Sequence, residues 1–280
     1  MGKSSKDKRD VYYRLAKEEN LRARSAFKLM QIDEEFNIFD GVTHVVDLCA
    51  APGSWTQVVR ERIGSTGKIV AVDLYAMAPL EGVFQIQGDI TNEETASEII
   101  KYFQGNSAQL VLCDGAPDVT QLLDFDEYIQ EQLLLAAFNI TTSILNPGGT
   151  FVAKIFRGRD VPIVVSHLQA FFKDVVIAKP RTSRNSSIEC FVLCRDYTPP
   201  QTFKPNMKKP LLSLEEYPIP GREVTFHICG SEFSYDPDTI YKLELKERNY
   251  EYQEPVQKPI LPPYAISMEL LQDGKINVGD

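Results

Sequence analysis

The sequence lacks the features that mark membrane and secreted proteins. No apolar run approaches the roughly 20 residues that a membrane helix needs, and the charged opening MGKSSKDKRD contains no apolar signal-peptide core. The five cysteines include no CxxC pair, which fits a reducing compartment and argues against structural zinc. We therefore expect a cytoplasmic protein with no membrane segment and no metal.

Also absent is the GxGxxG turn of dinucleotide-binding proteins, which disfavours a nicotinamide oxidoreductase. The segment Val45–Trp55 (VVDLCAAPGSW) instead predicts a short strand, a turn of small residues and the start of a helix, with Ser54 as its N-cap. Small residues let the backbone approach a ligand, and a helix N-terminus offers unpaired N–H groups to an anion. A compact ligand with a carboxylate fits this turn, and S-adenosylmethionine (AdoMet) is one.

The chain has no excess of positive charge, since its formal net charge is −9. Residues 1–28, however, hold nine Lys and Arg against four Asp and Glu, and residues 154–184 hold seven against two. Two basic segments in an acidic chain indicate a local surface for a polyanion. The alternative is a charged face that contacts only solvent.

Strand patterns alternate with helical patterns through the first 200 residues. The predicted strands lie at 45–48, 68–73, 83–87, 109–114, 150–155, 174–178 and 188–194. Such alternation predicts a mainly parallel sheet with helices on both faces. About nine residues separate the last two strands, too few for a parallel crossover, so these strands should pair antiparallel. This predicts an α/β, Rossmann-like class I AdoMet-dependent methyltransferase fold: a seven-stranded, mostly parallel sheet with one antiparallel strand.

Changes in composition predict three regions. Residues 1–40 form a basic N-terminal extension, helical from Val11, that is expected to bind RNA. Residues 41–198 form the methyltransferase domain, and residues 199–280 form a proline-rich tail that covers the domain or docks on a partner. Within this tail, Val224–Cys229 could form a short strand.

Four carboxylates follow predicted strands: Asp47, Asp73, Asp89 and Asp114. In an open α/β sheet, ligands bind beyond the carboxyl ends of the strands. Asp73 is placed to hold both ribose hydroxyls of an adenosine, Asp89 to accept from the adenine amine, and Asp114 to face the methionine amino group. Each of them could alternatively form only a turn or a helix cap.

Charged residues also interrupt segments otherwise suited to burial. Lys154 lies within FVAKIFRGRD and Glu189 starts the last strand. Such residues are almost never fully buried unless they are paired or functional. Together with Asp114, they should converge at the carboxyl edge of neighbouring strands, and Lys28 could reach them from the N-terminal helix. A structural ion-pair network is the alternative.

The motifs RSAFKL, DLCAAPGSW, CDGAPD, GGTFVAKIFRG and KPRTSRNSSIECFVLC resemble the FtsJ/RrmJ family of ribose 2'-O-methyltransferases. The resemblance covers the first 200 residues. It implies a catalytic tetrad of Lys28, Asp114, Lys154 and Glu189. It implies AdoMet-binding positions at Gly53, Trp55, Asp73, Asp89 and Asp114.

Within that family, the opening MGKSSKDKRDVYYRLAKE and the runs CDGAPDVT and FRGRD resemble the eukaryotic branch that methylates the tRNA anticodon loop at nucleotides 32 and 34. The resemblance implies two auxiliary proteins, a WD-repeat propeller and a large helical-repeat protein of the armadillo or HEAT type. A pre-rRNA or mitochondrial rRNA 2'-O-methyltransferase is the alternative enzyme. From another class, the alternative is a catalytically idle RNA-binding scaffold.

For the reaction, we expect Lys154 to take the proton of the 2'-hydroxyl, with the rest of the tetrad orienting the two groups. A protonated Lys154 that steers the lone pair of the hydroxyl and loses its proton late is the alternative. Phosphates of the RNA are expected to meet a set of basic residues from both basic segments. They are Lys3, Lys6, Lys8, Arg9, Arg22, Arg24, Arg157, Arg159, Arg181 and Arg184.

Overall fold

The computed structural model describes residues 9–117, 123–158, 161–208, 222–243 and 251–257. Its helices are α2 (Val11–Glu18), α3 (Ala26–Phe36), α4 (Ser54–Ile63), α5 (Glu93–Tyr102), α6 (Leu123–Ile144) and α7 (Val161–Leu168). Its strands are β1 (His44–Leu48), β2 (Lys68–Asp73), β3 (Val83–Gln87), β4 (Ala108–Cys113), β5 (Leu145–Phe156), β6 (Phe172–Pro180), β7 (Glu189–Tyr197) and β8 (Thr225–Cys229).

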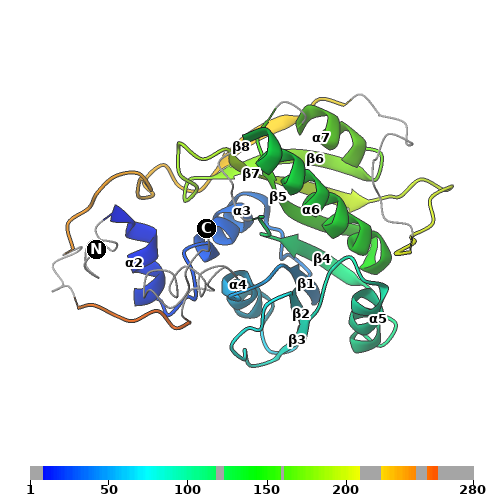
Figure 1. Cartoon of the computed structure of the whole chain (residues 1–280), viewed down its shortest axis with the longest axis horizontal. Coiled ribbons are helices and arrows are strands. Elements are labelled where there is room, and N and C mark those ends of the chain that lie inside the picture. The colour runs from blue at the N-terminus through cyan, green and yellow to red at the C-terminus, as the bar shows by residue number, and fades with distance from the viewer. Residues whose placement is uncertain (1–8, 118–122, 159–160, 209–221, 244–250, 258–280) are drawn as a thin grey trace, which may run out of the picture.

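The eight strands form one sheet in the order β3-β2-β1-β4-β5-β7-β6-β8 (Figure 1). β7 runs antiparallel to β5 and β6, and the other described pairings are parallel. The predicted Rossmann-like α/β fold and its antiparallel strand are confirmed. The sheet gains an eighth strand because residues 225–229 of the tail pair with β6.

Alternation along the strands divides the core into two layers, because successive side chains point to opposite faces of a sheet. Val45 and Val152 belong to the layer that packs against α3 and α4. Val46 and Phe151 belong to the layer that packs against α5, α6 and α7. Near-continuous apolar runs in β1, β2 and β4 follow from this two-sided burial.

The N-terminal region differs from the single helical stretch that the sequence predicts. α2 ends at Glu18, and Asn20 adopts a left-handed conformation with φ of 56°. α3 begins only at Ala26. Arg22 and Arg24 therefore lie in the connection between two helices and not on a helical face shared with Lys28.

The start of the described chain packs against the tail (Figure 1). The hydroxyl of Tyr12 donates to the carbonyl of Tyr235 at 2.9 Å, and Arg14 donates to the carbonyl of Lys242 at 2.9 Å. Only part of the tail therefore extends the sheet, and another part covers α2. No helix among the described residues is long and apolar enough to cross a membrane.

Replacing Phe138 of α6 by Ala should destabilise the fold by about 3–5 kcal/mol, because a fully buried ring would leave a cavity. Phe138 has no exposed surface, and its ring centroid lies 5.9 Å from that of Phe151 and 5.1 Å from that of Phe171. Urea unfolding measures the loss. Phe125 on the same helix is 48% exposed, and F125A should change stability by no more than about 0.5 kcal/mol. Equal losses in the two variants would contradict the described packing.

Candidate active site

The strand register brings two charged residues to the sheet face that α3 covers. Lys154 follows Val152 by two positions in β5, and Glu189 precedes Phe191 by two positions in β7. Val152 and Phe191 both pack in the layer of α3 and α4. The side chains of Lys154 and Glu189 therefore point to the helix that carries Lys28.

The four tetrad residues form one chain of contacts. Nζ of Lys154 lies 2.6 Å from Oδ1 of Asp114 and 3.4 Å from Oε2 of Glu189, and it donates to the backbone carbonyl of Asp114 at 2.9 Å. Nζ of Lys28 lies 2.7 Å from Oε1 of Glu189. The predicted convergence of residues from positions 28 to 189 is confirmed by this geometry.

The protonation states in this cluster follow from burial and neighbouring charge. Burial alone would lower the pKa of Lys154, but the charges of Asp114 and Glu189 outweigh burial and raise that pKa above its ordinary value. Burial would raise the pKa of Glu189, but Lys28 and Lys154 lower it to about 2. At neutral pH, Lys154 is therefore an ammonium and Glu189 a carboxylate.

Gly53 forms the tight turn between β1 and α4. Its φ is 100°, and a Cβ at this position would lie 3.0 Å from Nη1 of Arg22 and 3.1 Å from Cδ1 of Leu80. A side chain at this position would therefore be strained and crowded. The N-cap of α4 is Gly53 and not Ser54, which is the first helical residue, so no side chain caps the first N–H groups of the helix.

Trp55 belongs to the protein core and has 2% exposure. Its indole N–H donates to the carbonyl of Ser25 at 2.9 Å, and its ring lies 5.4 Å from that of Phe191. The hydroxyl of Ser25 donates to Oδ2 of Asp114. The predicted cofactor role of Trp55 can therefore involve only its backbone N–H at the start of α4, while its ring positions Ser25 and through it Asp114.

Asp73 and Asp89 both stabilise local backbone at the carboxyl ends of β2 and β3. Asp73 accepts the N–H of Ala51 in the Gly53 turn at 2.8 Å through Oδ2. Asp89 accepts both the N–H and the hydroxyl of Thr91 through Oδ1, at 2.8 and 2.7 Å. A carboxylate oxygen has two lone pairs, so each group retains acceptor capacity toward a ligand.

Asp47 is a buried carboxyl group to which the sequence assigned no role of its own. Oδ2 accepts the hydroxyl of Thr56 at 2.5 Å, while Oδ1 is buried without a hydrogen-bond partner. Burial raises the pKa of Asp47 to about 7, and the negative charges of Asp114 and Asp73 act in the same direction. The region below the turn therefore concentrates carboxyl groups, and a bound cation would favour the ionised form of Asp47.

Arg22, a predicted RNA contact, is held in contacts within the protein. Its guanidinium is directed into the protein and donates to the carbonyls of Pro52, Ala78 and Pro79 at 2.7–3.0 Å. The residue is 9% exposed. Its function is to tie the loop after β2 to the Gly53 turn.

Arg24 is likewise held in internal contacts, with Nη1 at 2.6 Å from Oδ2 of Asp10 and Nη2 bonded to the carbonyl of Thr182. Among the other predicted RNA contacts, Arg9, Arg157 and Arg184 are exposed, and Arg181 is partly buried. Lys3, Lys6, Lys8 and Arg159 lie outside the described residues.

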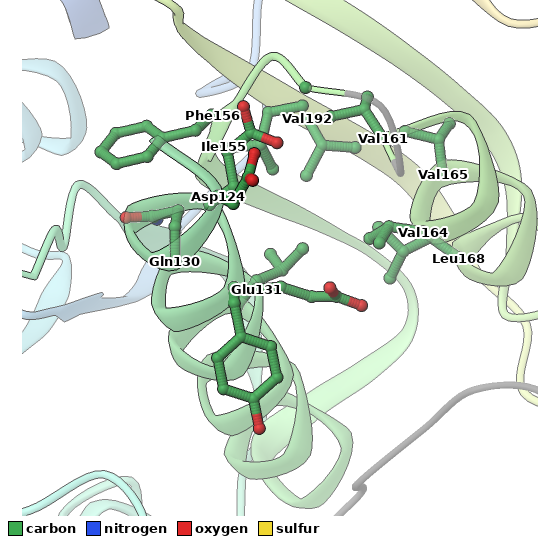
Figure 2. A pocket seen from close by; sticks show the side chains of 14 residues that line it. Asp124, Gln130, Glu131, Ile155, Phe156, Val161, Val164, Val165, Leu168 and Val192 are labelled. Atoms are coloured by element: carbon green, nitrogen blue, oxygen red, sulfur yellow. The ribbon is translucent and has the colours of Figure 1, made fainter. Parts of the chain in front are cut away.

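A cavity of about 250 Å³ lies between α6, α7 and the end of β5 (Figure 2). Valines and Leu168 line one side, and Asp124 and Glu131 of α6 line another. None of the predicted cofactor positions lines it. Gln130, which also borders the cavity, donates to the backbone carbonyl of Lys154 at 2.9 Å, so this space adjoins the tetrad from the opposite side of β5.

Two serines contact the tetrad without having been predicted. Ser25 binds Asp114, and Ser183 Oγ donates to Oε1 of Glu189 at 2.8 Å. Both stand inside the motifs that carry the family resemblance, but a serine in a loop is too common a residue to indicate a site by itself.

The open sheet reverses its strand order between β1 and β4, and the Gly53 turn and Asp114 follow those two strands. Ligands of doubly wound sheets bind at such a switch point. With β7 inserted antiparallel between β5 and β6, the fold is that of the Rossmann-like methyltransferases.

Comparison with known proteins gives the same class. The profile of the FtsJ-like methyltransferase family matches residues 21–197. A relative from Homo sapiens, named tRNA (cytidine(32)/guanosine(34)-2'-O)-methyltransferase, is 58% identical over 99% of this chain and 87% of its own length. A relative from Pyricularia oryzae, named AdoMet-dependent rRNA methyltransferase, is 36% identical over 94% of this chain but only 29% of its own length.

A crystal structure from Plasmodium falciparum, described as a ribosomal RNA methyltransferase, has a TM-score of 0.59 and 24% identity, and covers 64% of this chain and 100% of that one. This likeness supports the fold. The chain belongs to the FtsJ-like methyltransferase family.

Replacing Asp47 by Asn should make stability less dependent on pH. The folded chain keeps the Asp47 proton up to about pH 7, whereas the unfolded chain loses it near pH 4. The folded state binds more protons in this interval, so its free energy of unfolding should fall as pH rises through it. D47N removes that loss, and between pH 5 and 7.5 it should gain about 2–4 kcal/mol relative to the unsubstituted chain.

Urea unfolding at a series of pH values measures this difference. The exposed Asp40 provides the matched control, and D40N should follow the unsubstituted chain at every pH. Parallel curves for D47N and the unsubstituted chain would show that Asp47 is ionised in the folded protein.

Proposed function

We propose that this chain transfers a methyl group from AdoMet to ribose 2'-hydroxyls of the tRNA anticodon loop, at nucleotides 32 and 34. The observation that carries the proposal is the contact chain of Lys28, Glu189, Lys154 and Asp114 at the carboxyl edge of a methyltransferase sheet. Paired amines and carboxylates can hold a hydroxyl and take part in removing its proton. The 58% identical relative from Homo sapiens is named for this activity.

The residues around the Gly53 turn fit AdoMet. The cofactor carries an ammonium and a sulfonium charge. Asp47, Asp73 and Asp114 form a cluster of carboxyl groups, in which Oδ1 of Asp47 is buried without a hydrogen-bond partner. The uncapped N–H groups of α4 would hold its carboxylate. Asp73 would bind the ribose hydroxyls, Asp89 the adenine amine and Asp114 the amino group.

Lys154 is the central residue of the proposed reaction. When bound, AdoMet supplies a methyl group that its sulfonium charge already activates. A neutral Lys154 at pH 7.4 would cost roughly 4 kcal/mol from an ordinary pKa near 10.4, and the raised pKa of Lys154 increases that cost. This favours the alternative, in which Lys154 is an ammonium when the hydroxyl binds, over the neutral base.

An ammonium on Lys154 would donate a hydrogen bond to a lone pair of the ribose oxygen. Asp114 and Glu189 accept its other N–H groups and so fix its direction. Held in line with the methyl carbon, the oxygen would form the new O–C bond as the bond from that carbon to the sulfonium sulfur breaks and its electron pair stays on sulfur. The hydroxyl proton would become strongly acidic as the O–C bond forms. That proton would then pass to the carboxylate of Asp114.

The substrate assignment depends on the relatives. The rRNA-modifying relative from Pyricularia oryzae is 36% identical and this chain matches 29% of its length, whereas the tRNA-modifying relative is matched over 87%. The pre-rRNA or mitochondrial rRNA alternative is therefore the weaker one. An idle RNA-binding scaffold has no need for the buried contacts that Lys154 makes.

The division into residues 1–40, 41–198 and 199–280 remains part of the proposal, although α3 packs within the core layer of the sheet. The N-terminal basics, with the exposed Arg157 and Arg184, would contact phosphates. The two auxiliary proteins, a WD-repeat propeller and a helical-repeat protein, and a cytoplasmic location are likewise proposed from the resemblance.

Mapping of 2'-O-methyl groups in total RNA tests the substrate. Cells with K154A in place of the unsubstituted chain should lose the methyl groups at nucleotides 32 and 34 of their tRNAs and keep those of rRNA. K173A serves as the control, because the side chain of Lys173 is 65% exposed and pairs with Asp196 at the surface. Loss of rRNA methyl groups would favour the alternative substrate.

Binding of tRNA should weaken steeply with salt, since phosphate contacts release counterions. Replacing Lys3, Lys6, Lys8 and Arg9 together by Ala should reduce the slope of log K against log salt by about 0.9 for each phosphate that is no longer neutralised, or less for single-stranded loops. Filter binding between 50 and 200 mM salt measures it. The control K101A/K173A/K204A removes exposed lysines elsewhere, and an equal effect there would reject a specific role for the N-terminal segment.

A further inference from the structure

The carboxylate of Glu189 has a third partner besides the two lysines. Ser183 is 3% exposed, and its hydroxyl donates to Oε1 of Glu189 at 2.8 Å. Lys28 contacts Oε1 at 2.7 Å and Oε2 at 2.8 Å, while Lys154 approaches Oε2 at 3.4 Å. The last torsion of a glutamate side chain has a broad range, and the hydroxyl of Ser183 is one of three donors that fix the plane of the Glu189 carboxylate next to Lys154.

Ser183 lies in the connection 181–188 between β6 and β7, and the tail holds the start of this connection. The backbone N–H of Arg181 donates to the carbonyl of Cys229 at 2.9 Å. Nε of Arg181 donates to the carbonyl of Gly230 at 3.2 Å. β8 and the residue after it therefore fix the connection where it leaves β6.

The tail also holds this connection at Asn185. The N–H of Asn185 donates to Oδ2 of Asp238 at 2.7 Å, and its side-chain amide approaches Oδ1 of Asp236 at 3.4 Å. Asp236 also accepts the N–H of Asp238 at 2.9 Å and the hydroxyl of Thr239 at 3.1 Å. Residues 236–239 of the tail thus form a closed turn that holds Asp238 in a defined position.

α3 contacts the same connection at Thr182. Oε1 of Gln31 accepts the N–H and the hydroxyl of Thr182, at 2.9 and 3.0 Å. Gln31 stands one helical turn after Lys28. The connection is therefore held between the helix that carries one tetrad lysine and the tail.

We propose that residues 229–239 of the tail are a positioning element of the methyl transfer reaction, and that Ser183 is the positioning residue through which they act on Glu189. Residues 229–239 lie beyond the segment 21–197 that matches the family profile, whereas Ser183 lies within it. The proposal rests on the proposed function for its kinetic consequences, whereas the contacts themselves do not depend on the substrate.

Replacing Ser183 by Ala in the full chain should lower kcat about tenfold, the effect of one hydrogen bond to a charged group. KM for tRNA and for AdoMet should change by less than about twofold, because the hydroxyl of the buried Ser183 is directed to Glu189. S183T keeps the hydroxyl and should recover most of the rate. S186A removes an exposed serine of the same connection and should behave as the unsubstituted chain. An unchanged kcat in S183A would overturn the proposal.

The role of the tail is tested by D238A, with E232A as the control that removes an exposed acidic residue from the same segment. D238A should lower kcat about three- to tenfold, and D238N, which keeps an acceptor, should lower it less. If the tail acts through Ser183, the double variant S183A/D238A should be no slower than S183A. If the reductions in kcat of the two single variants instead multiply in the double variant, the tail does not act through Ser183.

Amide hydrogen exchange distinguishes failure of this proposal from failure of the proposed function. Protection of residues 181–189 should decrease in D238A but not in E232A, and this measurement requires no RNA. An unsubstituted chain that methylates no tRNA, with exchange as expected, would remove the proposed function alone. Methyl transfer to tRNA with unchanged exchange in D238A would remove the positioning element alone.

Discussion

The structure of the site depends on one buried amine. Lys154 stands inside a core strand, with its side chain 8% exposed, where an unpaired ammonium would be very unfavourable. Asp114 and Glu189 make its charge tolerable, and Glu189 in turn requires Lys28. Removing one member would leave another charge buried without compensation, which is strongly destabilising. The folded state therefore depends on bringing these residues together from distant segments.

This arrangement explains why the surrounding elements meet where they do. α3 has to lie on the face of β5 and β7 that carries the charges, because Lys28 reaches Glu189 only from that face. Trp55 anchors the start of α3 through Ser25, which also contacts Asp114. The same contacts therefore join the start of α4, Asp114 and the start of α3.

Much of this could be predicted from local pattern. β2 and β3 begin and end at the predicted residues, because buried strands bounded by turns have clear apolar limits. The apolar pattern from Val161 continues through Phe172, but α7 ends at Leu168. β6 begins at Phe172, and Arg222 of the tail donates to the carbonyls of Gln169 and Phe172. A tertiary contact of this kind leaves no mark in the periodicity of the helix.

The amino-acid sequence by itself determined the alternation of strands and helices along the chain from β1 to β7, because apolar periodicity carries it. Short motifs likewise determined the turn at Gly53 and which four charged residues come together. The tertiary structure decided where the described basic residues lie and which groups they contact. Arg22 and Arg184 are equally basic in the sequence, yet one ties two loops together inside the protein and the other is exposed. It also decided that the tail supports Glu189, through contacts between residues about fifty positions apart. Such pairings depend on how the whole chain packs, and no local pattern contains that information.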